Sequence, residues 1–253
     1  MHSGKLNARA GRGLRLRKLG IIGGTSWHST ALYYDHLNRG VAQRLGGLHS
    51  AALCIESLEF AAYAAMELAG DWDGVAKVTL DAAKRLEASG AEGVVITSNT
   101  GHKVFDAVAA NIDVPMLHIG DAVGDRLVSD RQARVALLGT RFTMTEGHVR
   151  DRLERRGIQL APIDPAWMQE VDRIIFEELA AGRVSRDSQR KLKTLITELA
   201  KQKVQAIVLG CTELVLAVEV RANVLPVYDS TVIHARAAVD WMLAEEEEAR
   251  AAA

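Results

Sequence analysis

One stretch of this sequence changes abruptly from apolar to hydrogen-bonding residues. In VVITSNTGHK, residues 94–103, a mostly β-branched run typical of a buried strand passes directly into Ser98, Asn99 and Thr100. Side-chain and backbone donors at the start of a helix are what binding a carboxylate requires. The same residues can also cap the helix that follows, and the two roles are compatible. The stretch therefore indicates a polar site at the end of a buried strand.

A second stretch, AIVLGCTEL at residues 206–214, has the same form but contains a thiol. Cys211 ends the apolar run, and Thr212 and Glu213 follow it. A helix whose first amides point at a cysteine lowers the thiol pKa from about 8.5 toward neutrality, which would make Cys211 a nucleophile or general base. The alternative is a buried structural cysteine. The polar neighbours favour a chemical role, because a strand end that only packs has little need of them.

The spacing of apolar residues predicts the elements that position these groups. From Lys18 onward, short apolar runs alternate with longer amphipathic ones, which is the pattern of βαβ units and a parallel sheet. The predicted strands span residues 19–24, 51–57, 92–98, 114–120, 134–140, 157–163, 205–211 and 224–230. The predicted helices include residues 29–43, 72–88, 144–156, 167–181 and 186–202.

The predicted strands form two matching sets of four. LGIIGGTS matches VALLGTRFT and VVITSNT matches AIVLGCTE, while 75 residues separate Gly23 from Ser98 and 72 separate Gly139 from Cys211. An internal duplication explains this agreement. It predicts an α/β protein of two similar parallel-sheet domains, related by a pseudo-twofold axis, with a ligand in the cleft between them. Ser98 and Cys211 then flank the cleft from opposite sides, which suits chemistry on both faces of one carbon.

Further polar side chains are expected at the same cleft. Four hydroxyl groups follow the first strand of each half, and they belong to Thr25, Ser26, Thr140 and Thr143. His102 and His118 follow the third and fourth strands of the first half. These two histidines either line the cleft and tune a thiol or make structural hydrogen bonds.

Composition excludes several classes of partner. The chain has 253 residues, 48% of them apolar, and 31 lysines and arginines nearly balance 32 aspartates and glutamates. Nothing in this balance indicates nucleic acid or an anionic membrane as a partner. No apolar run approaches the roughly 18 residues of a membrane span, and no signal sequence opens the chain, so we expect a cytoplasmic protein that binds a small molecule. Residues 1–17 are basic and are interpreted as a poorly ordered extension.

The motifs give no sign of a cofactor or a metal. GIIGGTS lacks the G-x-G-x-x-G spacing of a dinucleotide loop, and Lys103 is interpreted as helix surface or cleft rim rather than a pyridoxal phosphate lysine. The eight histidines lack a metal spacing such as H-E-x-x-H. Cys54 and Cys211 have neither metal nor disulfide spacing. We therefore predict chemistry without a cofactor.

Several motifs, in the same order, resemble those of the aspartate/glutamate racemase family of cofactor-independent amino-acid racemases. The family opening GxxGGxSWxSTxxYY is similar to GIIGGTSWHSTALYY at residues 20–34. The N-T-x-H-K and G-C-T-E-(L/I) signatures stand at residues 99–103 and 210–214, and GTRFTM at 139–144 also matches. The resemblance runs from about Lys18 to Leu243, so it covers most of the chain.

The resemblance also implies an arrangement of domains. Family members are two-domain α/β proteins in which the chain returns to complete the first domain. By this pattern, residues 18–115 and 226–253 form the first domain and residues 116–225 the second. The resemblance further implies a homodimer.

For the mechanism, the resemblance implies a reaction with two bases. One residue removes the α-proton of the amino acid and the other reprotonates the carbon from the opposite face. Most members use two cysteines, whereas here Cys211 stands at the second position and Ser98 at the first. Because a hydroxyl is far less acidic than a thiol, Ser98 is a poor base but can still donate a proton. In the family the second-half cysteine serves the L face, so the resemblance implies a racemase, of aspartate or glutamate first, that accepts L substrates much better than D.

A second departure from the family concerns the substrate side chain. Many relatives place an arginine for the side-chain carboxylate where this chain has Ala52. Arg183 is a candidate substitute, although an exposed arginine is the more common outcome there. Two other functions stay open: a one-cysteine decarboxylase or isomerase of the same superfamily, and a noncatalytic amino-acid-binding relative.

Overall fold

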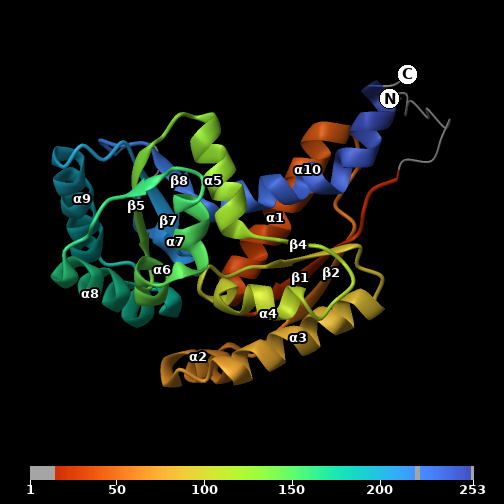
Figure 1. The fold of residues 1–253 in the computed structure, drawn as a ribbon, viewed down its shortest axis with the longest axis horizontal. Helices are drawn as coiled ribbons and strands as arrows, with labels where there is room; N and C mark the ends of the chain where they lie inside the picture. The colour runs from red at the N-terminus through yellow and green to blue at the C-terminus, as the bar shows by residue number, and fades with distance from the viewer. Residues whose placement is uncertain (1–14, 220–222, 252–253) are drawn as a thin grey trace, which may run out of the picture.

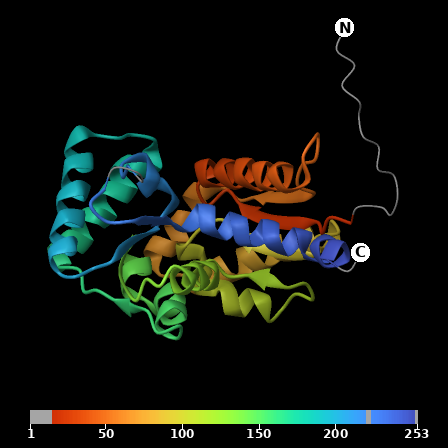
Figure 2. The ribbon, with the colours of Figure 1, turned by 90° about the horizontal axis from the view of Figure 1, so that it is seen from above.

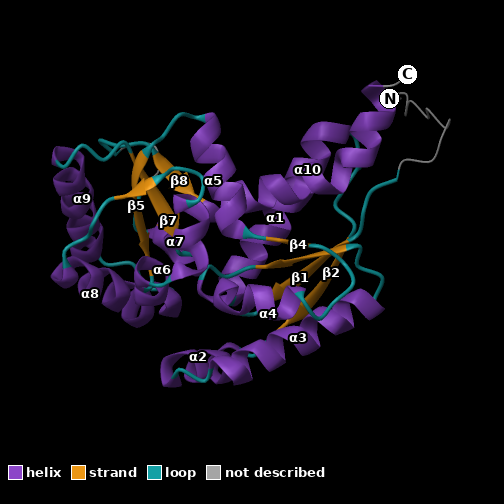
Figure 3. Cartoon of the chain, in the orientation of Figure 1, coloured by secondary structure: helices purple, strands orange, loops and turns teal. Residues whose placement is uncertain are grey.

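A computed structural model of the chain describes residues 15–219 and 223–251. Most of the basic extension predicted over residues 1–17 lies outside the described residues. The described chain forms two four-stranded parallel sheets with flanking helices, which confirms the predicted fold (Figure 1). Figure 3 shows the two sheets as separate groups of strands. In the described part of the chain, no helix is both long enough and apolar enough to cross a membrane.

The two sheets have the same strand order. The first is ordered β2-β1-β3-β4, with β1 (Leu19–Gly23), β2 (Leu53–Ser57), β3 (Gly93–Ile96) and β4 (Met116–Leu117). The second is ordered β6-β5-β7-β8, with β5 (Arg134–Gly139), β6 (Gln159–Leu160), β7 (Ala206–Gly210) and β8 (Val227–Asp229). This shared order is what a duplicated unit requires, and it gives β3 and β7 equivalent positions.

Helices cover both faces of the first sheet. One face carries α1 (Trp27–Leu45) and α10 (Ser230–Ala251), and the other carries α2 (Phe60–Ala69), α3 (Trp72–Ala88) and α4 (Phe105–Ala109). Successive residues of a strand point to opposite faces, so Ile21 packs with α1 and α10 while Ile22 packs with α2 and α3. Burial on both faces explains why β1 and β3 are continuous apolar runs.

The second sheet is covered in the same way. One face carries α5 (Ile119–Ser129) and α7 (Gly147–Glu154). The other carries α6 (Arg141–Thr145), α8 (Pro165–Arg173) and α9 (Arg186–Lys201). In β5, Leu137 packs in the layer with α5 and α7, and Leu138 packs in the layer on the opposite face.

Some predicted elements are shorter or interrupted in the structure. The strand predicted over 114–120 is only β4, because α5 begins at Ile119 and the His118 side chain caps it by accepting a hydrogen bond from the Gly120 amide at 2.9 Å. The helix predicted over 144–156 is divided at Glu146 into α6 and α7. The helix predicted over 167–181 begins as α8 and continues as a π-helical turn, Ile174–Glu178, and a 3-10 turn, Leu179–Ala181.

The chain passes between the two halves after β4 and again after β8. β4 pairs with β3 in the first sheet, so that sheet extends past the predicted domain boundary at residue 115. β8 pairs with β7 in the second sheet, past the predicted boundary at residue 225. The fourth strand therefore completes each repeated unit before the chain leaves it. After the second crossing, α10 runs back alongside α1 (Figure 2).

Candidate active site

The polar strand ends identified in the sequence meet at one pocket. Residues that follow β1, β3, β5 and β7 line it, all at the carboxyl ends of parallel strands. The lining residues from these strand ends are Thr25, Ser26, Ser98, Asn99, Thr100, Thr140, Gly210, Cys211, Thr212 and Glu213. Ser98 from the first half and Cys211 from the second thus share a single pocket.

Cys211 is deeply buried at the end of β7. Its side chain is 7% exposed, and Sγ donates a hydrogen bond to Oε2 of Glu213 at 3.1 Å. The Thr212 hydroxyl donates to the same carboxylate oxygen at 2.6 Å. One oxygen of Glu213 therefore accepts hydrogen bonds from both Cys211 and Thr212.

The prediction of a lowered thiol pKa is wrong for this structure. Burial raises the pKa of Cys211 well above its usual value, and the charge of the Glu213 carboxylate raises it further. The amides of Glu213 and Leu214 act in the opposite direction but are outweighed. Only the short 3-10 helix Thr212–Leu216 follows Cys211, so few aligned peptide dipoles face the sulfur. In this state Cys211 is a protonated thiol.

Ser98 stands at the equivalent point of the first half. Its Oγ accepts a hydrogen bond from the Gly101 amide at 3.1 Å, at the start of the 3-10 helix Thr100–Val104. Asn99 Nδ2 donates to Oγ of Ser230 at 3.0 Å, where α10 begins. The strand end is thus fixed to the returning helix, which holds Ser98 in place.

A hydroxyl pair joins the two halves at the pocket. Oγ1 of Thr100, after β3, lies 2.9 Å from Oγ1 of Thr140, after β5. Thr143 lies behind Thr140, with 3.3 Å between their hydroxyl oxygens, and it is not among the residues that line the pocket. Thr143 therefore supports the wall through Thr140.

The turn after β1 presents two hydroxyls that lack a protein partner. Thr25 Oγ1 and Ser26 Oγ are buried and have no hydrogen-bond partner among the described residues. Ser26 has a φ of 85°, in the left-handed region that non-glycine residues rarely adopt. Gly24 precedes it with a φ of 83°, and a Cβ there would lie 2.1 Å from the Leu58 carbonyl oxygen. This constrained turn leaves both hydroxyls able to bind a ligand.

His102 and His118 lie outside the set of residues that line this pocket. The Nδ1 of His102 donates to the Ser98 carbonyl at 2.6 Å, and its Nε2 accepts from the Ile119 amide at 3.1 Å. Burial lowers the pKa of both histidines, the charge of His234 lowers the pKa of His102 further, and the charge of His102 lowers that of His118. Their contacts therefore correspond to the structural role considered above. His102 holds the backbone of Ser98, and His118 caps α5.

Comparison with known proteins assigns the chain to a family. The family model for Asp/Glu/hydantoin racemases matches residues 22–238. The chain belongs to the Asp/Glu/hydantoin racemase family. Its membership makes it an isomerase of the racemase type, as the resemblance implied.

Solved structures and a curated relative agree with this membership. A Yersinia pestis protein proposed to be an Asp/Glu racemase is 41% identical with a TM-score of 0.84, covering 90% of this chain and 100% of that one. An aspartate racemase homologue from Pyrococcus horikoshii is 33% identical with a TM-score of 0.78, covering 90% of this chain and 99% of that one. The broad specificity amino-acid racemase RacX of Bacillus subtilis is 26% identical over 174 residues, 69% of this chain and 75% of the relative.

The two positions considered for a substrate carboxylate lie away from the pocket of this family member. Ala52 precedes β2, and its carbonyl accepts from the Leu19 amide at 2.9 Å, at the amino edge of the sheet. The five residues of β2 put that edge roughly 16 Å from the carboxyl edge, and Ala52 is not among the residues that line the pocket. Arg183 is exposed and donates to the Glu177 carbonyl at 2.5 Å, and it is not a lining residue.

Two lining residues on α2 were not identified from the sequence. Phe60 begins this alanine-rich helix, and Glu67 lies near its end. The Glu67 side chain is 5% exposed, and its Oε1 has no partner among the described residues. Burial raises the pKa of Glu67 to about 7. A lone acidic residue within FAAYAAMELA was the available signal, but nothing local distinguishes it from a solvent-exposed helix position.

We expect Glu67→Gln to stabilise the protein at pH 8. A carboxyl whose pKa rises from 4.5 to about 7 on folding gives stability that is fully present below pH 4.5 and is lost as the pH rises through 7. The neutral amide avoids this loss, so the variant should gain up to about 3 kcal/mol at pH 8 and little at pH 5. Urea denaturation at both pH values measures the difference.

The matched control for this stability test is Glu59→Gln. Glu59 caps the same helix but is exposed, and its pKa is lowered by hydrogen bonds from the Ala62 and Ala61 amides. This control should not gain stability at pH 8. An equal gain for both variants would show that the Glu67 carboxyl is not the cause.

The remaining wall of the pocket comes from the interrupted helix after α8. Ile175 and Phe176 of the π-helical turn and Ala180 of the 3-10 turn line it. A π-helical turn contains one residue more than an α-helical turn, and such turns occur often at functional sites. Here it brings two successive side chains, Ile175 and Phe176, to the pocket.

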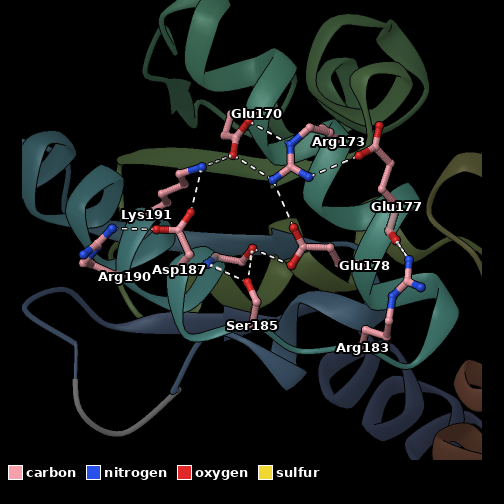
Figure 4. Close-up of polar contacts among 10 residues, drawn as sticks. Glu170, Arg173, Glu177, Glu178, Arg183, Ser185, Asp187, Arg190 and Lys191 are labelled. Carbon is pink, nitrogen blue, oxygen red and sulfur yellow. Dashed lines mark hydrogen bonds and ion pairs between the residues drawn. The ribbon is translucent and has the colours of Figure 1, made fainter.

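A polar network fixes this turn from outside the pocket (Figure 4). The Arg173 guanidinium lies 2.9 Å from Glu170, 3.2 Å from Glu177 and 3.0 Å from Glu178. Lys191 of α9 also binds Glu170, at 2.8 Å, and these two cations lower the pKa of Glu170 to about 2. Isolated surface pairs contribute little, but this network joins α8, the π-helical turn and α9. It therefore restrains the wall that carries Phe176.

Proposed function

We propose that the protein racemises free amino acids without a cofactor, by transferring the α-proton between two residues on opposite faces of the substrate. Cys211 acts on the L face and Ser98 on the other face. The observation that carries this proposal is that Ser98 and Cys211, at equivalent strand ends of two repeated halves, line one pocket. Membership in the racemase family supports it.

The α-carboxylate of the substrate is proposed to bind at the strand ends between these two residues. Asn99, Thr100 and Thr212 line the pocket beside them and bring backbone amides and hydroxyls to it. Thr25 and Ser26 add hydroxyls that have no partner among the described residues. Several neutral donors can hold a carboxylate without the desolvation cost of a buried cation.

Proton transfer begins from a protonated Cys211. Its hydrogen bond to Glu213 identifies the carboxylate that receives the thiol proton when the thiolate forms. The thiolate removes the α-proton of the L-amino acid, and its sulfur becomes a thiol again. The Ser98 hydroxyl donates its proton to the opposite face of the carbanion and becomes an alkoxide. The proton held by Glu213 then returns to this alkoxide through water, which restores both residues to their starting states. Removal of the α-proton from a D-amino acid would require Ser98 to be the base, so L-amino acids exchange their α-proton faster than D-amino acids.

The test of this proposal is α-proton exchange in deuterium oxide. Wild-type protein is incubated separately with a set of L- and D-amino acids, and the α-proton signal is followed by nuclear magnetic resonance. We expect exchange with at least one L-amino acid, and slower exchange with its D enantiomer. The absence of exchange above the buffer rate for every amino acid would contradict the proposal. Loss of carbon dioxide from a malonate-type acid would instead support a decarboxylase, and binding without exchange a noncatalytic relative.

The homodimer and the cytoplasmic location implied by the resemblance remain predictions. Sedimentation of the purified protein tests the first, and a sedimentation coefficient that corresponds to a single chain at micromolar concentration would contradict it. Cell fractionation tests the second.

A further inference from the structure

The residues that line the pocket come from two sets of elements, which we assign to a reacting part and to a part for the substrate side chain. The reacting part consists of Ser98, Cys211 and the neighbouring donors from the strand ends. The other part is formed by α2 and the interrupted helix after α8, and its residues are Phe60, Glu67, Ile175, Phe176 and Ala180. Four of these five side chains are apolar, and Glu67 is the exception.

The charges in this pocket do not suit an acidic side chain. No lysine or arginine is found among the described residues that line it, whereas two glutamates are. Glu213 already accepts hydrogen bonds from Cys211 and Thr212. A second substrate carboxylate would enter a buried pocket with no cation to neutralise it, which costs several kcal/mol.

Glu67 is a buried carboxyl group that a cation could bind. Its carboxyl is buried, and Oε1 has no hydrogen-bond partner among the described residues. No ion pair with Glu67 is found among the residues that the structure describes, although native structures nearly always pair buried charges. A cationic substrate group would supply both the missing hydrogen bond and the missing charge.

We propose that Glu67 selects amino acids whose side chain is an aliphatic chain ending in a cation, in preference to acidic side chains. This inference rests on the proposed racemase function and names its substrate class. The methylene groups contact the apolar walls formed by Phe60, Ile175 and Phe176, and the terminal cation binds the Glu67 carboxylate. It departs from the expectation of aspartate or glutamate, which rested on the resemblance alone.

The experiment compares substrates of similar length that differ in charge. Exchange in deuterium oxide is measured for L-lysine, L-ornithine, L-norleucine and L-glutamate with wild type, Glu67→Gln and the control Glu59→Gln. We expect wild type to prefer L-lysine or L-ornithine over L-norleucine and L-glutamate. In Glu67→Gln, kcat/KM for the cationic substrate should fall about 10- to 100-fold, while that for L-norleucine changes less than about threefold. The control should leave both values unchanged.

Two outcomes would overturn the inference while leaving the racemase function in place. One is faster exchange of L-glutamate than of any cationic amino acid. The other is an equal loss for L-lysine and L-norleucine in Glu67→Gln, which would mean that Glu67 binds the α-ammonium group or acts only on the fold.

A binding measurement separates this inference from the failure of the proposed function. The melting temperature is measured with and without L-lysine or L-norleucine. Each ligand is present at about 10 mM, a concentration suited to weak binding. We expect a larger shift with L-lysine in wild type, and loss of that difference in Glu67→Gln. Equal shifts with both ligands in wild type would overturn the inference, whether or not exchange is seen.

Discussion

Cys211→Ala should lower the rate of α-proton exchange from L-amino acids by about 10²- to 10⁴-fold, the range lost when a general base is removed. In the proposed mechanism the thiol removes the proton on the L face, and alanine leaves no basic group at this position of the pocket. The measurement is exchange in deuterium oxide at saturating substrate, with kcat and KM determined separately. The fall should appear in kcat.

The control for this variant is Cys54→Ala. Cys54 is the other cysteine of the chain, lies in β2 and does not line the pocket. Its replacement should leave exchange unchanged. If Cys211→Ala retained more than about a tenth of the wild-type kcat, Cys211 would not be the base, and the proposed mechanism would fail.

Ser98→Cys should raise exchange from D-amino acids by about 10²-fold or more, and so bring D and L rates closer together. A thiol with an ordinary pKa of about 8.5 forms an anion far more readily than a serine hydroxyl does. The Gly101 amide that now donates to Ser98 Oγ at 3.1 Å is placed to stabilise a thiolate at this position. Initial rates with matched D and L substrates measure the change.

Ser57→Cys provides the comparison for the second variant. Ser57 ends β2, the strand beside β1, but it is exposed and does not line the pocket. A thiol there should not alter the D rate. A Ser98→Cys protein that folds but gains no D activity would show that the first-half face of the pocket does not deliver protons to the substrate.

Much of the fold could be predicted from local patterns because those patterns have local causes. Strands buried on both faces must be apolar throughout, so Leu19–Gly23 and Ala206–Gly210 are recognisable as continuous runs. The repeat then gave the pairing of Ser98 with Cys211, since equivalent strand ends of a duplicated unit reach the same cleft. This part of the site needed no knowledge of distant contacts.

The rest of the site depends on contacts between residues far apart in sequence. The thiol pKa of Cys211 follows from how deeply the whole fold buries it, which the adjacent residues do not reveal. Glu67 reaches the pocket because α2 packs against α3 beneath the first sheet, and its helix pattern alone is that of an ordinary surface position. Ala52 stands before β2, at the amino edge of the sheet, whereas the residues that line the pocket follow the carboxyl ends of the strands.

The two passages of the chain between the halves limit how the pocket can open. One passage follows β4 and the other follows β8, and a hydrogen bond of 3.1 Å between His234 and the Leu117 carbonyl places them side by side. Two covalent links that lie side by side allow the two halves to rotate about the line that joins the links, but they resist sliding of one half past the other. Ser98 belongs to one half and Cys211 to the other, so the same two links also limit how far these residues can slide past each other.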